Sequence, residues 1–155
     1  MKIDTIDAYW HSFLAKLPVH SNYHYKPYAA EQFGHSPELA DVLGGLILSG
    51  AKTGTCSSLW EWEAEGKMIP QPGLITIVLN SRDEPLCIIE DTEVYVTRFR
   101  DVDDEFAEAE GEGDLSLDYW REAHTRYFSR ILPKIGRDFR EDMPVVCERF
   151  KVIYK

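Results

Sequence analysis

The sequence contains no apolar stretch that approaches the roughly 18 residues of a membrane-spanning helix. Its most hydrophobic stretch, residues 42–48, is interrupted by two adjacent glycines. The first four residues, Met-Lys-Ile-Asp, lack the apolar core of a secretory signal peptide. We therefore expect a cytoplasmic protein that has no membrane among its partners.

The sequence is also poor in cysteine, with three residues, Cys56, Cys87 and Cys147, and no CxxC pair. This scarcity excludes a zinc ribbon and a thioredoxin motif. Each cysteine lies beside apolar residues or in a strand-like segment, which predicts buried free thiols. His20 and His24 have an HxxxH spacing, but they lie in a predicted loop and lack the helical HExxH context of a zinc site. We therefore expect neither a metal site nor a cofactor.

Basic residues are also few: the chain has 17 Lys and Arg but 27 Asp and Glu, which gives a formal net charge of −10. Proteins that bind duplex DNA normally present a basic surface, so the charge balance argues against duplex DNA as a partner. It leaves open a small substrate, or a short single-stranded RNA held in a local pocket.

The remaining composition is that of a folded globular protein, with 44% hydrophobic and 28% charged residues. These fractions argue against intrinsic disorder of the whole chain. A length of 155 residues fits one domain with a hydrophobic core. We therefore expect a single domain that spans residues 1–155.

Hydrophobic periodicity and capping residues predict the order of helices and strands. The expected helices cover residues 6–16, 37–49, 59–65, 101–110 and 116–135. The expected strands cover residues 74–79, 86–98 and 145–154, with a hairpin turn at 80–83 and a short extended segment at 52–58. Residues 19–35 show no clean periodicity and are predicted to form an ordered loop. This order favours an α+β fold with a mostly antiparallel curved sheet or small barrel over a βαβ fold.

The densest group of small polar residues spans Ser49 to Ser58. It is not a phosphate-binding loop, because it follows a predicted helix and lacks the required spacing. A lysine beside a threonine hydroxyl is a base–nucleophile combination, which makes Lys52 and Thr55 candidates. In an extended chain the two side chains point to opposite faces, although local twist can bring them together. The alternative is a solvated turn whose hydroxyls satisfy a strand edge.

A second group of polar residues contains Glu108, Glu110, Glu112 and Asp114, interspersed with two glycines. Glycines permit tight turns, so one of these carboxylates can enter a pocket. The alternative is an acidic solvated loop before the next helix, and no calcium-loop pattern fits. His124 lies on the aromatic face of the predicted helix 116–135, where a core or cleft histidine is expected more often than a catalyst.

Two motifs in these segments resemble the ASCH domain family. The run Gly50-Ala51-Lys52-Thr53-Gly54-Thr55 matches its GxKxxT motif, and Glu110-Gly111-Glu112-Gly113-Asp114 is similar to a second signature of a longer bacterial branch. The second signature continues through Ser116-Leu117 and Tyr119-Trp120-Arg121 to His124. The resemblance implies a small, mostly antiparallel PUA-like β-barrel flanked by helices, with a cleft beside the GxKxxT segment.

The resemblance also implies three candidate functions. One is an amidohydrolase that removes the acyl group from N(4)-acylated cytidine; its lysine, threonine and glutamate correspond to Lys52, Thr55 and Glu110. The others are a single-strand ribonuclease that uses the same cleft, and a non-catalytic module that binds RNA or modified nucleosides. Several family members have a basic residue where Ser57 stands here. That difference, with the acidic net charge, favours a nucleoside substrate over a long RNA.

The expected mechanism assigns a role to each residue of this site. Thr55 is expected to be the nucleophile or to position the attacking water, and Lys52, with a pKa lowered by burial, is the expected base. The alternative is that Lys52 acts through its charge and Glu110 removes the proton. Glu110 orients Lys52 or donates a proton to the leaving amine. Substrate contacts are expected from three further residues, namely Ser57, Trp60 and Arg98.

Overall fold

The computed structural model of the protein describes residues 2–155. The chain forms two compact units. The first unit contains Met1–Gly50, Gly73–Glu90 and Lys151–Lys155, and the second contains Ala51–Pro72 and Asp91–Phe150. Among the described residues, no helix is both long enough and apolar enough to cross a membrane. The expectation of a single domain stays a prediction.

Five strands are hydrogen-bonded in the order β1-β3-β4-β5-β2. Their bounds are Ala29–Gln32 for β1, Gly54–Ser58 for β2, Ile75–Leu79 for β3, Pro85–Arg98 for β4 and Pro144–Tyr154 for β5. β3 pairs antiparallel with β4, and β2 pairs antiparallel with β5, whereas β1 pairs parallel with β3. The mostly antiparallel sheet, accompanied by helices, confirms the predicted α+β class.

In the first unit, helices α1 (Lys2–Leu14) and α2 (Pro37–Ser49) accompany strands β1 and β3. The predicted helix 37–49 is confirmed by its capping residues. The Ser36 side chain accepts a hydrogen bond from the Leu39 amide, Pro37 occupies the first turn, and Gly50 ends the helix with a φ of 86°. The core of this unit consists of Trp10, Phe13, Ile75, Ile77, Leu79 and Ile88.

The prediction of a loop over residues 19–35 is wrong for part of the segment. Asn22–Tyr25 forms a 3-10 helix, and Ala29–Gln32 forms strand β1. All four residues of β1 are exposed, so the sequence carries no alternation of apolar and polar side chains that would reveal a strand. Backbone pairing with β3 defines this strand instead.

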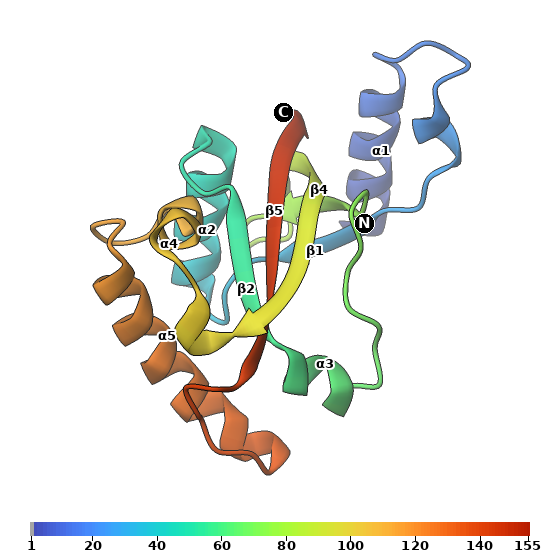
Figure 1. The fold of residues 1–155 in the computed structure, drawn as a ribbon. Helices are drawn as coiled ribbons and strands as arrows, with labels where there is room; N and C mark the ends of the chain where they lie inside the picture. The colour runs from blue at the N-terminus through green and yellow to red at the C-terminus, as the bar shows by residue number, and fades with distance from the viewer. Residues whose placement is uncertain (1) are drawn as a thin grey trace. The chain divides into compact units, whose positions relative to one another are not determined.

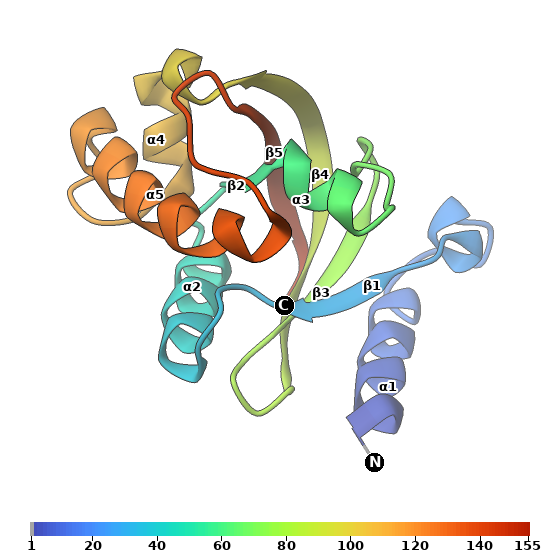
Figure 2. The same cartoon turned by 90° about the horizontal axis from the view of Figure 1, so that it is seen from below.

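The second unit contains α3 (Leu59–Ala64), α4 (Asp104–Glu110) and α5 (Leu117–Ile131) beside β2 and parts of β4 and β5. In Figures 1 and 2, β2 runs beside β5 and α4 lies next to α5. The predicted helix 116–135 becomes 3-10 from Leu132 because Pro133 lacks an amide donor. The core of this unit consists of Phe99, Val102, Phe106, Ala107, Trp120, Phe128, Leu132, Met143, Val145 and Cys147.

The three cysteines are free thiols, as predicted. Cys87 and Cys147 are buried, and Cys56 is partly buried where it lies opposite Cys147 in the β2–β5 register. Burial raises the pKa of Cys87 to about 11 and raises the pKa of Cys56 well above its usual value. Neutral thiols of this kind act as small apolar side chains.

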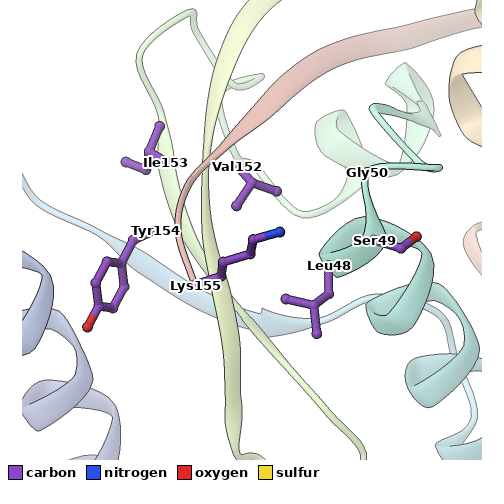
Figure 3. Close-up of a pocket in the computed structure, with 7 residues that line it drawn as sticks. All are labelled: Leu48, Ser49, Gly50, Val152, Ile153, Tyr154 and Lys155. Atoms are coloured by element: carbon purple, nitrogen blue, oxygen red, sulfur yellow. The ribbon is translucent and has the colours of Figure 1, made fainter.

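A pocket of about 380 Å³ lies in the first unit, between the end of α2 and the end of β5. Figure 3 shows the residues that line it. The Val152 and Lys155 side chains extend toward Leu48, whereas Tyr154 points toward α1. Tyr154 there packs against the Tyr9 ring, with their centroids 5.2 Å apart. This pocket contains none of the residues predicted to carry chemistry.

Candidate functional site

The segment between α2 and β2 directs the Lys52 side chain into the interior of the second unit. The Thr53 amide donates to the Ala109 carbonyl oxygen at 2.7 Å, and the Phe150 amide donates to the Thr53 carbonyl oxygen at 3.0 Å. The segment is therefore held by α4 on one side and by β5 on the other. Ala51 and Thr53 are exposed, whereas Lys52 between them is buried.

The Lys52 ammonium is surrounded by three oxygen acceptors. Its Nζ donates to Glu110 Oε2 at 2.8 Å, to the Glu110 backbone carbonyl at 3.4 Å and to Glu112 Oε2 at 3.4 Å. A lysine ammonium has three N–H donors, so this set satisfies all of them. The side chains of Lys52, Glu110 and Glu112 are 1%, 3% and 31% exposed, so Glu112 is the most solvent-accessible of these three groups.

Gly111 permits the close approach that this ion pair requires. It ends α4 with a φ of 73°, a left-handed conformation that favours glycine. A methyl group at this position would overlap the Ala51 carbonyl oxygen and lie 2.9 Å from the Lys52 Cα atom. The end of α4 therefore packs directly on the backbone that carries Lys52.

The second oxygen of Glu110 is held by helix α5. The Trp120 indole donates to Glu110 Oε1 at 3.2 Å, and His124 Nε2 lies 3.4 Å from the same oxygen. His124 Nδ1 is 2.9 Å from the Trp120 carbonyl oxygen, and the two rings stack with centroids 4.1 Å apart. Because both ring nitrogens of His124 face acceptors, the imidazolium form is favoured.

The charges in the cluster shift one another's pKa values. Burial alone lowers the pKa of Lys52, but the Glu110 and Glu112 carboxylates raise it, and its pKa lies above the usual value. Burial alone raises the pKa of Glu110, but the Lys52 ammonium and His124 hold it well below the usual range. The expected net lowering of the Lys52 pKa is therefore wrong, because the two carboxylates outweigh the effect of burial. Lys52 and Glu110 form an ion pair.

The other two ionisable groups respond differently. Burial raises the pKa of Glu112, and the neighbouring Glu110 carboxylate raises it further despite the opposing effect of Lys52. Burial lowers the pKa of His124, but the hydrogen bond to Glu110 and that carboxylate's charge raise it above the usual value. Two carboxylates only two residues apart therefore have pKa values shifted in opposite directions.

Thr55 lies three residues after Lys52, on strand β2. Thr55 is half-buried on β2, opposite Glu148 of β5. Among the described residues, no hydrogen bond joins its hydroxyl to Lys52 or to Glu110. Lys52 and Gly54 are buried, whereas Thr53 between them is exposed. If this alternation continues along β2, the Thr55 side chain lies on the same face as Thr53 and on the face opposite to Cys56. The proposed pairing of a Lys52 base with a Thr55 nucleophile gains no support from this arrangement.

The three predicted substrate contacts have structural partners of their own. The Ser57 hydroxyl accepts a hydrogen bond from Trp62 Nε1 at 2.8 Å. The Arg137 guanidinium lies 4.6 Å from the centroid of the Trp60 ring. Arg98 is exposed and pairs with the Asp101 carboxylate at 2.6 Å. None of these contacts involves the ion pair, so the role of Ser57, Trp60 and Arg98 in substrate binding stays a prediction.

Three residues of the site were missed as functional candidates from sequence alone. The sequence places Glu112 in an acidic group, Trp120 in the second motif and His124 on the aromatic face of a predicted helix, and it assigns a chemical role to none of them. All three lie in the second motif, so its residue pattern contained the signal. The motif gives no spatial reason to connect them with Lys52, which lies 58 residues before Glu110.

Other features of the described residues do not suggest a metal centre. Among them, no group of three or more His, Cys, Asp or Glu residues is arranged to hold a metal ion. A separate acidic pocket of about 540 Å³ lies in the second unit, and it does not include the ion pair. Its lining residues are Glu93, Tyr95, Asp101, Asp103, Glu105 and Arg149.

The sequence profile of the ASCH domain matches residues 29–154, and the chain belongs to the ASCH domain family. A crystal structure of an ASCH domain from Lactobacillus crispatus JV V101 is 36% identical, with a TM-score of 0.92 over 98% of this chain and 96% of that chain. A protein from Enterococcus faecalis V583 is 35% identical, with a TM-score of 0.85 over 98% of this chain and 90% of that chain. No curated protein matches this chain. The predicted PUA-like α+β fold, a β-barrel with flanking helices, is confirmed by these structures.

We expect Gly111→Ala to destabilise the protein more than Gly136→Ala. Both glycines have a positive φ, of 73° and 75°, so both substitutions strain the backbone. Only the methyl group at position 111 meets neighbouring backbone atoms, whereas nothing lies within 4 Å of the corresponding position at Gly136. Urea denaturation should show a loss of about 1–2 kcal/mol for Gly136→Ala and a clearly larger loss for Gly111→Ala. Equal losses would contradict the close packing of α4 on Lys52.

Glu110→Gln should lower the free energy of unfolding by about 3–5 kcal/mol at neutral pH, because it leaves the Lys52 ammonium buried without its main partner. Glu110 has a depressed pKa in the folded state, so its contribution is present above the unfolded-state pKa of about 4.3 and is lost as pH falls toward the folded-state value. The difference between wild type and variant should therefore shrink below about pH 4. Urea denaturation of wild type and Glu110→Gln at neutral pH and below about pH 4 measures this difference in unfolding free energy.

Glu108→Gln is the matched control, because Glu108 lies on the same helix but is exposed. Its unfolding free energy should stay within about 0.5 kcal/mol of wild type. A similar loss in both variants would mean that the ion pair does not stabilise the fold.

Proposed function

We propose that the protein is an amidohydrolase that removes the acyl group from N(4)-acylated cytidine. In this reaction water adds to the amide carbonyl carbon, the bond from that carbon to the exocyclic nitrogen breaks, and cytidine and a carboxylic acid are released. The proposal is carried by the contact between Lys52 of the GxKxxT motif and Glu110 of the second motif. These are two of the three positions that the family resemblance associates with this reaction.

The electrostatics assign Lys52 a different role from the one expected from sequence. Glu110 and Glu112 raise its pKa, so a neutral amine is rare and Lys52 is a poor base. A buried ammonium is instead suited to stabilise negative charge that develops on the amide oxygen in the transition state. We therefore propose that the Lys52 ammonium binds the carbonyl oxygen of the substrate and stabilises the charge that develops on it.

The other two proposed residues act beside this charge. Glu110 accepts from Lys52, Trp120 and His124, and it positions the ammonium as part of a rigid network. Thr55 is half-buried on β2, and we assign its hydroxyl to hold the attacking water or the substrate. Neither role requires Lys52 and Thr55 to touch.

The acidic character of the chain favours a nucleoside over a polynucleotide substrate. A nucleoside carries no phosphate, so a protein with a net charge of −10 binds it without repelling a charged backbone. Single-strand ribonuclease activity and non-catalytic binding of RNA or a modified nucleoside are the competing outcomes. Purified protein incubated separately with N(4)-acetylcytidine and with single-stranded RNA, each with and without chelator, distinguishes them. We expect cytidine release that is insensitive to the chelator.

Lys52→Met should lower kcat/KM for N(4)-acetylcytidine by at least about 100-fold, because it removes the charge proposed to stabilise the transition state. Lys52→Arg keeps a positive charge but does not give up a proton, so it should retain more activity than Lys52→Met. Lys67→Met is the control, because Lys67 is exposed and pairs with Glu65 on the surface. If Lys52→Met and Lys52→Arg are both folded and equally inactive, Lys52 acts as a base and not only through its charge.

Thr55→Ala should reduce kcat/KM by about 100-fold or more, as expected when a hydroxyl that contacts the reacting atoms is removed. Thr55→Ser keeps that hydroxyl and should recover most of the loss. Thr97→Ala, at another half-buried threonine on β4, controls for general effects on the strands. Unchanged kinetics in Thr55→Ala would remove Thr55 from the mechanism.

A further inference from the structure

We propose that Glu112, and not Glu110, is the carboxyl group that transfers protons in this reaction. The inference rests on the proposed function and identifies a further catalytic residue for it. It follows from the different positions of the two carboxylates around the same ammonium group. The Glu110 side chain is buried beside Lys52, whereas the Glu112 side chain, which contacts the same ammonium, is 31% exposed.

The contact between Lys52 and Glu112 is the one that a substrate can replace. All three N–H donors of Lys52 already have acceptors, so the ammonium can bind a substrate oxygen only by giving up one of them. Both contacts with Glu110 involve a residue whose side chain is only 3% exposed. Glu112, at 3.4 Å and 31% exposed, is the reachable partner. A carbonyl oxygen that takes its place at Lys52 leaves the Glu112 carboxylate beside the carbonyl carbon.

Glu110 is poorly suited to transfer protons. Its Oε2 atom accepts from Lys52, and its Oε1 atom accepts from Trp120 and faces His124, so neither oxygen is open toward a substrate. These donors also hold the pKa of Glu110 well below its usual range, which makes it a weak base. Glu110 is therefore a positioning residue for the ammonium.

Glu112 has the electrostatic environment of a better base. The charged groups that face it are Lys52 before β2, Glu110 at the end of α4 and His124 on α5. Burial and the Glu110 charge raise its pKa, and these effects outweigh the opposing influence of Lys52 and His124. A carboxylate with a raised pKa accepts a proton more readily, and it remains ionised at a pH above that value.

The proton transfers balance over the reaction. The Glu112 carboxylate takes a proton from water as the water oxygen bonds to the carbonyl carbon, and the resulting oxyanion is held by Lys52. As the oxyanion collapses, the carbon–nitrogen bond breaks and Glu112 returns the proton to the leaving exocyclic nitrogen. Glu112 ends as a carboxylate, and the products are cytidine and a carboxylic acid.

The kinetics of Glu112→Gln as a function of pH test this assignment. Glutamine still offers Lys52 an oxygen acceptor but does not titrate, so kcat/KM for N(4)-acetylcytidine should fall by about 10²–10⁴-fold. In wild type, kcat/KM should rise with pH through the pKa of Glu112, with a midpoint above the value of about 4.3 for an ordinary glutamate. This rise should be absent from the residual activity of Glu112→Gln and present in Glu108→Gln.

The outcomes separate this inference from the function on which it rests. If wild type does not hydrolyse acylated cytidine, the proposed function fails and the assignment of Glu112 fails with it. If wild type is active and Glu112→Gln keeps its rate and pH profile, only the Glu112 assignment is overturned. Urea unfolding tests whether Glu112 has only a structural role. We expect Glu112→Gln to lower the free energy of unfolding less than Glu110→Gln does. A loss of activity that only parallels a loss of folded protein would also overturn the assignment.

Discussion

The candidate site depends on one buried ion pair between Lys52 and Glu110. Moving either charge from water into a protein interior costs several kcal/mol, and that cost is offset only when geometry and hydrogen bonds are good. Here every ammonium donor has an acceptor, and Glu110 also receives the Trp120 indole and faces His124. This requirement fixes the relative positions of α4, α5 and the segment before β2 within the second unit.

The fold was predictable where local chemistry determines it. Ser36, Pro37 and Gly50 mark the ends of α2 because each satisfies or replaces a backbone group at a helix terminus. Strand β1 was not predictable, because its four exposed residues are defined by pairing with a strand more than 40 positions later in the chain. Sequence patterns report burial, and a strand without buried side chains leaves no such pattern.

The site was predictable in its members but not in its electrostatics. Two motifs identified Lys52 and Glu110, and the structure places them in contact. The sign of the Lys52 pKa shift was missed because it depends on how many carboxylates surround the ammonium. Sequence suggested burial, which lowers the pKa of a lysine, but it did not reveal that Glu112 joins Glu110 around the same nitrogen.

The difference between the two carboxylates has its origin in the backbone between them. Glu110 is the last residue of α4, and Gly111 then turns the chain through a left-handed conformation. Because Gly111 packs on Ala51 and Lys52, Glu110 is held inside while Glu112 emerges toward solvent, although both reach the same ammonium. Neighbouring groups whose pKa values are pushed apart by their surroundings are suited to divide positioning and proton transfer between them. In this chain, a helix-ending glycine creates that division.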